Sequence, residues 1–191
     1  MHLRLATPAD ISAIDALIAA SARALSVGYY TPEQIESLIR HVFGPDSQLI
    51  ADGTYYVIES GGVLAAAGGW SRRRTMYGGD QMKGDSDPLL DPATEPARIR
   101  AFFVHPDFAR RGLGRILFER CRDEAAAAGF RALTLVATLP GEPLYRAVGF
   151  ETVRRFELIL PDGVSVPASD MTLVPIRTPS AQGRDAPVAI G

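Results

Sequence analysis

The sequence predicts a mixed α/β or α+β domain in which one β-sheet carries helices on both faces. Three observations support this. Two amphipathic helical segments follow capping signals near the N-terminus, two strand-like runs meet at Gly61-Gly62, and a strand–turn–helix segment with a further apolar strand comes later. The chain has 191 residues, which suits one domain. We expect a single domain over residues 1–174 and a loose tail over residues 175–191.

Composition narrows the functional classes. Apolar residues make up 47% of the chain and charged residues 22%, as in ordinary soluble globular proteins. The single cysteine excludes an intramolecular disulfide and fits a reducing cytoplasm, where we expect the protein to be. We find no signal-peptide pattern and no run approaching the ~18 apolar residues that span a bilayer. A net charge of −2 argues against bulk nucleic-acid binding. We therefore expect no membrane and no nucleic-acid partner.

The first elements are a short strand at residues 3–6 and two helices. Thr7-Pro8 and Thr31-Pro32 each place an N-cap residue before a proline at the first helical position. The apolar residues that follow recur at helical spacing, as Ile11, Ile14, Leu17 and Ile18 and then as Ile35, Leu38, Ile39 and Val42. We expect two amphipathic helices, the second ending at Gly44-Pro45.

A hairpin and a long irregular stretch come next. Residues 54–60 and 63–70 are expected strands, and Gly61-Gly62 tolerates positive φ at both turn positions, which predicts a tight hairpin. Residues 71–96 contain an arginine run, Arg72 to Arg74, and several acids but no periodic pattern. A loop of this length is usually functional or disordered.

The second half alternates strands and helices. We expect a strand at 98–104, a helix at 113–128 that stops at Gly129, an apolar strand at 133–137, and a short helix at 142–148. A last hairpin joins 151–160 to 164–173 through Pro161-Asp162-Gly163. The buried face of the long helix is expected to hold Leu113, Leu117, Cys121, Ala125 and Ala128.

The segment from Phe102 to Arg115 carries the chemistry. A strand ends near Pro106, and a basic, glycine-containing loop enters the long helix. A helix N-terminus offers unpaired N–H groups and a partial positive charge, so it favours phosphate, and Gly112 and Gly114 let an anion approach the main chain. The P-loop pattern is missing, and the dinucleotide fingerprint needs a third glycine where Leu117 stands. A nucleotide-binding module nevertheless stays open as an alternative.

Two motifs resemble those of the GNAT N-acetyltransferase superfamily. Val104-His105-Pro106 followed by residues 109–114 is similar to the family's acetyl-CoA pyrophosphate loop, Arg/Gln-x-x-Gly-x-Gly/Ala, with Ala109 in place of the first residue. Residues 144–150 resemble its Leu/Phe-Tyr-x-x-x-Gly-Phe run. The resemblance implies a mostly antiparallel sheet of six to seven strands, with a central parallel pair that splays after Val104 and at residues 133–137.

The resemblance also implies acetyl-CoA as co-substrate and a primary amine of a small molecule or peptide as acceptor, attacked directly in a ternary complex. Tyr145 would be the general acid that protonates the departing thiolate. A homodimer fits the resemblance as well. The residues implied to bind acetyl-CoA are Phe103, Val104, Ala109, Arg110, Arg111, Gly112, Leu113, Gly114, Arg115 and Thr138.

No general base is evident, and other readings remain. Glu95, Asp80, Asp85 and Asp87 are better surface acids than bases, and a water chain can do the same work. His105 is expected to be a turn residue and Cys121 a core residue. The three histidines lack ligand spacing, so we expect no metal. A catalytically weak acyl-CoA sensor and an acyltransferase that uses a longer acyl-CoA are the alternatives.

Overall fold

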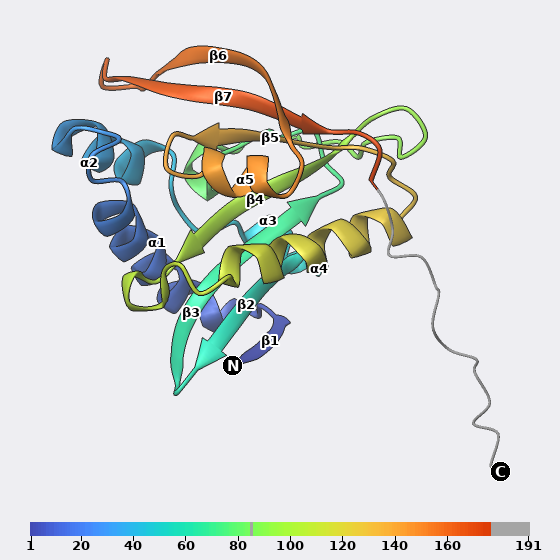
Figure 1. Ribbon diagram of the computed structural model, residues 1–191, viewed down its shortest axis with the longest axis horizontal. Helices are drawn as coiled ribbons and strands as arrows, with labels where there is room; N and C mark the ends of the chain where they lie inside the picture. The colour runs from blue at the N-terminus through green and yellow to red at the C-terminus, as the bar shows by residue number, and fades with distance from the viewer. Residues whose placement is uncertain (85, 177–191) are drawn as a thin grey trace, which may run out of the picture.

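The computed structural model describes residues 1–84 and 86–176. They form one seven-stranded sheet in the order β1-β2-β3-β4-β5-β7-β6, in which β4 and β5 are parallel and the other neighbours antiparallel (Figure 1). The expected mixed, mostly antiparallel sheet is therefore confirmed. The strands are β1 (His2–Leu5), β2 (Tyr55–Ser60), β3 (Val63–Ser71), β4 (Ala97–Val104), β5 (Leu133–Thr138), β6 (Glu151–Ile159) and β7 (Ser165–Leu173).

Helices cover both faces of this sheet. They are α1 (Ile11–Leu25), α2 (Pro32–His41), α3 (Ser47–Ala51), α4 (Leu113–Ala127) and α5 (Glu142–Ala147). The alternation of side chains along β2 separates two cores: Tyr55 and Val57 pack with residues of α1, whereas Tyr56 and Ile58 pack with residues of α4. The long helices α1 and α4 thus lie on opposite faces, as Figure 1 shows.

The capping signals place the N-terminal helices. The Thr31 hydroxyl accepts the Gln34 N–H at 3.2 Å, and the Gln34 side chain accepts the Thr31 N–H at 3.0 Å, so α2 begins at Pro32 as predicted. Thr7 and Asp10 make a similar box, but it opens a 3₁₀ turn over Pro8–Asp10, and the α-helix starts at Ile11. The predicted apolar faces are largely buried.

Some expectations need correction. The short helix α3 was not expected, because five residues carry too little periodicity to mark a helix. Ala128 is exposed, since α4 ends one residue before it.

Gly61 and Gly62 have φ of +59° and +79°, which confirms the tight hairpin between β2 and β3. The expected tail lies outside the described residues from residue 177 on.

The parallel pair β4–β5 splays apart, as the family resemblance implied. The two strands pair only at Ala97 with Leu133 and at Arg98 with Thr134. Further along, Ala101 has a φ of +54°, and the register of β4 against β3 shifts between Ala67 and Gly69. This β-bulge redirects β4 away from β5.

Candidate active site

A cavity of about 230 Å³ lies where β4 and β5 diverge. Its walls come from the C-terminal end of α1, the link between α2 and α3, residues 76–79, β4, the end of β5, and α5. Five of the residues expected at the site line it together: Phe103, Val104, Gly114, Thr138 and Tyr145. The structure thus brings residues from three separate segments of the sequence to one concave place, which is where ligand sites usually form.

Phe103 and Val104 contribute to the cavity in different ways. The His105 N–H donates to the Ala65 carbonyl at 2.9 Å, so by the alternation of an antiparallel ladder the main chain of Phe103 also points toward β3. Phe103 therefore offers its side chain to the cavity, where it packs edge-on against Phe43 at 5.3 Å between ring centroids. The Val104 N–H points away from β3 and donates to the Ser21 hydroxyl at 3.2 Å.

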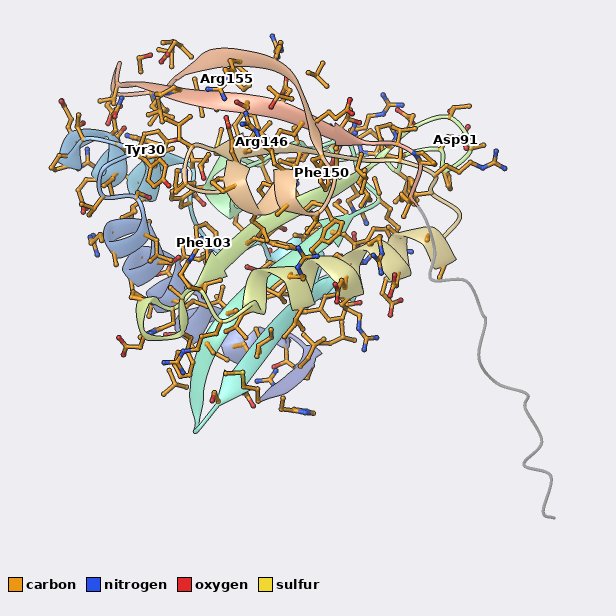
Figure 2. The ribbon with its side chains drawn as sticks, viewed as in Figure 1. Tyr30, Asp91, Phe103, Arg146, Phe150 and Arg155 are labelled. Atoms are coloured by element: carbon orange, nitrogen blue, oxygen red, sulfur yellow. The ribbon has the colours of Figure 1, made fainter. Side chains whose placement is uncertain are left out.

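Tyr145 lies on α5, between two other aromatic rings. Its ring centroid is 6.2 Å from that of Phe102 and 5.7 Å from that of Phe150, and its residue surface is 9% exposed. Burial raises the pKa of the Tyr145 phenol well above its usual range. The phenol therefore keeps its proton throughout the physiological pH range, and Tyr145 lines the cavity. Figure 2 labels Phe103, which also lines the cavity, and Phe150, which packs against the Tyr145 ring.

The loop before α4 presents its main chain. Gly112 is the N-cap of α4 with φ of +81°, and Arg110 has φ of +62°. The first N–H groups of α4 with a bond in the helix belong to Arg115 and Ile116, and both donate to the Gly112 carbonyl. Within the described chain, the five N–H groups of residues 110–114 have no hydrogen-bond acceptor. Such a row of free donors at a helix N-terminus suits an anion.

Side chains around this loop have partial structural roles. The Arg111 guanidinium lies over the Phe108 ring at 5.3 Å, and Arg115 donates to the Ala147 carbonyl at 3.3 Å at the end of α5. All three arginines of the loop are exposed. Ala109 is half-buried, whereas the Leu113 side chain is only 2% exposed and belongs to the core under α4. Leu113 can thus offer an external ligand its N–H but not its side chain.

Gly114 has a packing reason as well as a binding one. A Cβ atom there would lie 2.7 Å from the Leu144 Cδ2 atom, because the start of α4 packs tightly against α5. Gly112 differs, since a Cβ there would meet nothing within 4 Å. A substitution at Gly114 therefore disturbs the α4–α5 contact, whereas one at Gly112 projects into open space.

The acids considered as a base are engaged elsewhere. Glu95 pairs with Arg74 at 3.1 Å, Asp80 accepts the Ser47 N–H at 3.0 Å, and Asp87 accepts the Thr75 N–H at 2.9 Å. Asp85 lies outside the described residues. Over residues 1–84 and 86–176, no aspartate or glutamate lines the cavity.

A buried ion-pair cluster beside the cavity was missed by sequence reasoning. Arg100, 3% exposed, lines the cavity and binds Asp46 at 2.9 Å, while Lys83 also pairs with Asp46. Arg100 further donates to the carbonyls of Thr75 at 2.8 Å and Gly78 at 2.6 Å, which fixes the loop that forms one cavity wall. Two signals pointed here: two arginines, Arg98 and Arg100, inside a strand whose other residues are apolar, and an Asp-Ser pair able to cap α3.

The remaining polar candidates have structural places. His105 accepts the Asp107 N–H at 3.2 Å and caps the turn before α4. Cys121 is fully buried in the core, and burial raises the pKa of its thiol. Glu142 is buried against the Ser169 hydroxyl at 2.6 Å and two arginines, Arg146 and Arg155, which converge on it from α5 and β6 (Figure 2). Among the described residues there is neither a metal-binding group of three side chains nor a helix able to span a membrane.

Comparisons with known proteins agree with this geometry. Residues 19–150 match the sequence profile of the acetyltransferase (GNAT) family. A GCN5-related N-acetyltransferase from Rhodopseudomonas palustris superposes with a TM-score of 0.66 at 21% identity, over 91% of this chain and 94% of that one. YncA, a putative acetyltransferase from Salmonella typhimurium solved with acetyl-CoA, gives 0.60 at 18% identity, over 97% and 99%.

A third similar structure is the PaiA N-acetyltransferase from Thermoplasma acidophilum in complex with coenzyme A. It has a TM-score of 0.60 at 12% identity and covers 91% of this chain and 98% of that one. At these identities the solved structures share the fold with this chain. No curated protein sequence matches the chain.

Proposed function

The chain belongs to the acetyltransferase (GNAT) family, and on this premise we propose that it transfers the acetyl group of acetyl-CoA to a primary amine of a small molecule or protein. The observation that carries the proposal is the splay of β4 from β5. It opens into a cavity that Val104 and Tyr145 both line, next to the free N–H groups before α4. The free N–H groups before α4 suit the phosphates of acetyl-CoA, and the cavity suits its thioester and the acceptor amine.

The residues around α4 fit the diphosphate of acetyl-CoA. Five consecutive N–H groups lack acceptors within the described chain, Gly112 leaves the space above them open, and Arg110 is exposed beside them. We propose that main-chain groups do most of the binding, so that Ala109 is tolerated where the family has Arg or Gln. The proposed binding set is Phe103, Val104, Ala109, Arg110, Arg111, Gly112, Leu113, Gly114, Arg115 and Thr138.

Bound acetyl-CoA supplies an activated acetyl thioester, and residues of this chain orient the thioester and donate a proton to the departing thiolate. The Val104 N–H is the donor proposed to polarise the thioester carbonyl, and it must then exchange its bond to the Ser21 hydroxyl for one to the ligand. Tyr145 is the proposed acid for the thiolate, since its phenol is protonated and lines the cavity. Cys121, the only thiol, is buried in the core under α4, so we propose direct attack by the amine without an acyl-enzyme.

A weak or inactive acyl-CoA sensor is the second candidate. Ala109 in the phosphate loop and the lack of a carboxylate in the described cavity wall favour it. The two candidates differ in turnover, because a sensor binds acetyl-CoA without releasing free thiol when an amine is added.

The first test is a melting screen with acetyl-CoA, coenzyme A, a longer acyl-CoA, ATP and NAD. A ligand at ~100 times its Kd adds about 2.7 kcal/mol to the free energy of unfolding. We expect stabilisation by acetyl-CoA and coenzyme A. Stabilisation by ATP or NAD alone would contradict the assignment, and a preference for the longer acyl-CoA would change the donor.

The second test concerns Tyr145. Tyr145→Phe keeps the ring between Phe102 and Phe150 and removes the acidic proton. We expect acetyl-CoA affinity to be unchanged and thiol release to fall by roughly 10²–10⁴, or about tenfold if water replaces the phenol. Tyr29→Phe, at an exposed position, is the matched control. Unchanged turnover in Tyr145→Phe would leave Tyr145 as a packing residue only.

A further inference from the structure

We assign the acceptor to the part of the cavity formed by residues of α1, by the link between α2 and α3, and by the loop at residues 76–79. Its lining is mostly apolar and includes Ala22, Leu25, Val42 and Met76, while Ser21, Ser26 and Tyr77 add hydroxyl groups. The whole cavity has about 230 Å³, below the ~300–1,000 Å³ of pockets that hold drug-sized ligands. An acceptor that fits is small and has an apolar body.

The charges at the wall are unfavourable to a second cation. In the described residues, the one charged residue among those that line the cavity is Arg100, a cation whose side chain is 2% exposed and is bonded to Asp46 and to two loop carbonyls. The nearest carboxylate that Arg100 contacts, Asp46, is 1% exposed and is already paired with both Arg100 and Lys83. An ammonium group in the cavity would find no carboxylate partner here, and a buried charge without a partner is strongly disfavoured.

We infer that the acceptor is a small hydrophobic monoamine, bound as the neutral amine, and that polyamines and lysine-rich segments are excluded. This inference rests on the proposed function and names the substrate class of the same site. The apolar wall selects the body of the acceptor, and Arg100 selects against its ammonium form. The acid-rich loop at residues 80–95 does not provide a cation site, because its described acids are bonded to its own main chain or to basic side chains.

The same selection explains how a site can work without a carboxylate base. A neutral primary amine and a thioester give an amide and a free thiol: the N–C bond forms, the C–S bond breaks, and the proton lost by nitrogen equals the one gained by sulfur. Transfer from a neutral amine therefore releases no net proton. The Tyr145 phenol can donate its proton to the thiolate sulfur, and the proton lost by nitrogen can reach the phenolate through solvent. An ammonium ion must first lose a proton to a base, and the described cavity wall offers no carboxylate for that.

The test compares hexylamine with cadaverine, which have the same number of non-hydrogen atoms and differ by a methyl group in place of a second ammonium. Binding to the full chain saturated with coenzyme A is measured by calorimetry, so that it does not depend on turnover. We expect hexylamine to bind roughly 100-fold or more tightly than cadaverine. Equal binding, or tighter binding of cadaverine, overturns the inference.

The pH dependence of binding is the second readout. An alkyl amine has a pKa near ~10.4, so its neutral fraction rises about tenfold for each pH unit between about pH 7 and about pH 9. The titratable side chains that line the described cavity are Tyr77, Arg100 and Tyr145. Burial raises the pKa of the Tyr145 phenol, and although burial lowers the pKa of the Arg100 guanidinium, its ion pair with Asp46 holds it in the charged form, so the slope reports the amine. Hexylamine affinity that does not rise with pH, or no hexylamine binding at about pH 9, overturns the inference.

Ser26 offers a matched pair of variants. It lines the cavity at the end of α1, so Ser26→Asp adds a carboxylate while Ser26→Asn adds nearly the same shape without charge. We expect Ser26→Asp to shift the preference toward cadaverine by about tenfold or more and Ser26→Asn to leave it unchanged. Equal shifts in both variants count against the inference.

The proposed function fails in a different way. If hexylamine binds as expected and adding acetyl-CoA releases no thiol, acetyl transfer to this class of amine is refuted while the binding preference stands. If thiol is released with cadaverine and not with hexylamine, acetyl transfer stands and the inferred acceptor class is wrong. The comparison in the wild-type chain needs no variant to fold.

Discussion

The sharpest test of the phosphate loop is a charge placed at Gly112 without a change of shape. Gly112→Asp and Gly112→Asn differ only in one carboxylate oxygen against an amide nitrogen. A Cβ at Gly112 meets nothing within 4 Å, so neither side chain collides with the fold. The φ of +81° strains any side chain, but Asn and Asp tolerate it better than other residues, and the strain is shared by both variants.

The expected magnitude follows from Coulomb's law. A carboxylate at Gly112 would lie roughly 6 Å from each phosphate of a diphosphate bound to the adjacent N–H groups, and at an effective dielectric constant of ~40 each unit charge then repels by about 1.4 kcal/mol. Two charges give about 3 kcal/mol, or about a hundredfold in the Kd for acetyl-CoA. The loss should shrink as salt is added, because the site is exposed.

Calorimetric titration of each variant with acetyl-CoA measures the effect. Gly62 in the β2–β3 turn provides the control, since its φ of +79° and open surroundings match those of Gly112 while it does not belong to the loop before α4. Gly62→Asp should bind acetyl-CoA as wild type does. Equal affinity of Gly112→Asp and Gly112→Asn would refute diphosphate binding before α4. A Gly114 variant decides less, because it also meets Leu144.

Further predictions concern the loop, the pH profile and the buried ion pair. Ala109→Arg should leave acetyl-CoA affinity equal or slightly tighter by titration, and a loss of binding would contradict the alignment of the loop. Because burial raises the pKa of the Tyr145 phenol, the proton that we propose it donates is present at all pH values below that raised pKa, and thiol release should show no alkaline loss up to about pH 10. Asp46→Asn breaks a buried pair with Arg100 and should lower stability by about 3–5 kcal/mol and the Tm by roughly 10 °C, whereas Asp80→Asn, at a 44% exposed side chain, should change the Tm little.

Local signals in the sequence predict most of the fold. The Thr31 box and the Gly61-Gly62 turn act within a few residues, so their patterns are complete in the sequence. The strand–turn–helix geometry around Gly112 is also local, since Gly112 and the strand before it lie in one continuous segment. These features needed no knowledge of which segments meet in space.

Other features depend on contacts between distant segments. The conformation of residues 71–96 depends on Arg73, which donates to Asp52 at 2.6 Å, and on Arg100, which donates to two carbonyl oxygens of the loop. Arg73 lies in an arginine run that does not differ from a surface charge run, and the position of Arg100 in a strand does not say which carbonyls it bonds. The short helix α3 similarly follows from the Asp46 cap and its buried partners rather than from apolar spacing. The composition of the cavity wall also depends on contacts between distant segments, because its residues come from six separate places in the sequence.

The placement of charge in the cavity has one further consequence for catalysis. Arg100 lies among the lining residues because the bulge at Ala101 turns β4 just beyond it, so the feature that opens the splay also brings a cation to the acceptor end. If the acceptor and the thioester bind as we propose, a cation there would oppose the ammonium form of the acceptor and favour the negative charge that develops on the thioester oxygen. Replacing Arg100 with Met would remove both effects together. The substitution would weaken the preference for neutral amines and lower turnover even where acetyl-CoA still binds. If only the amine preference or only the turnover changed, Arg100 would act through the loop that it holds and not through its charge.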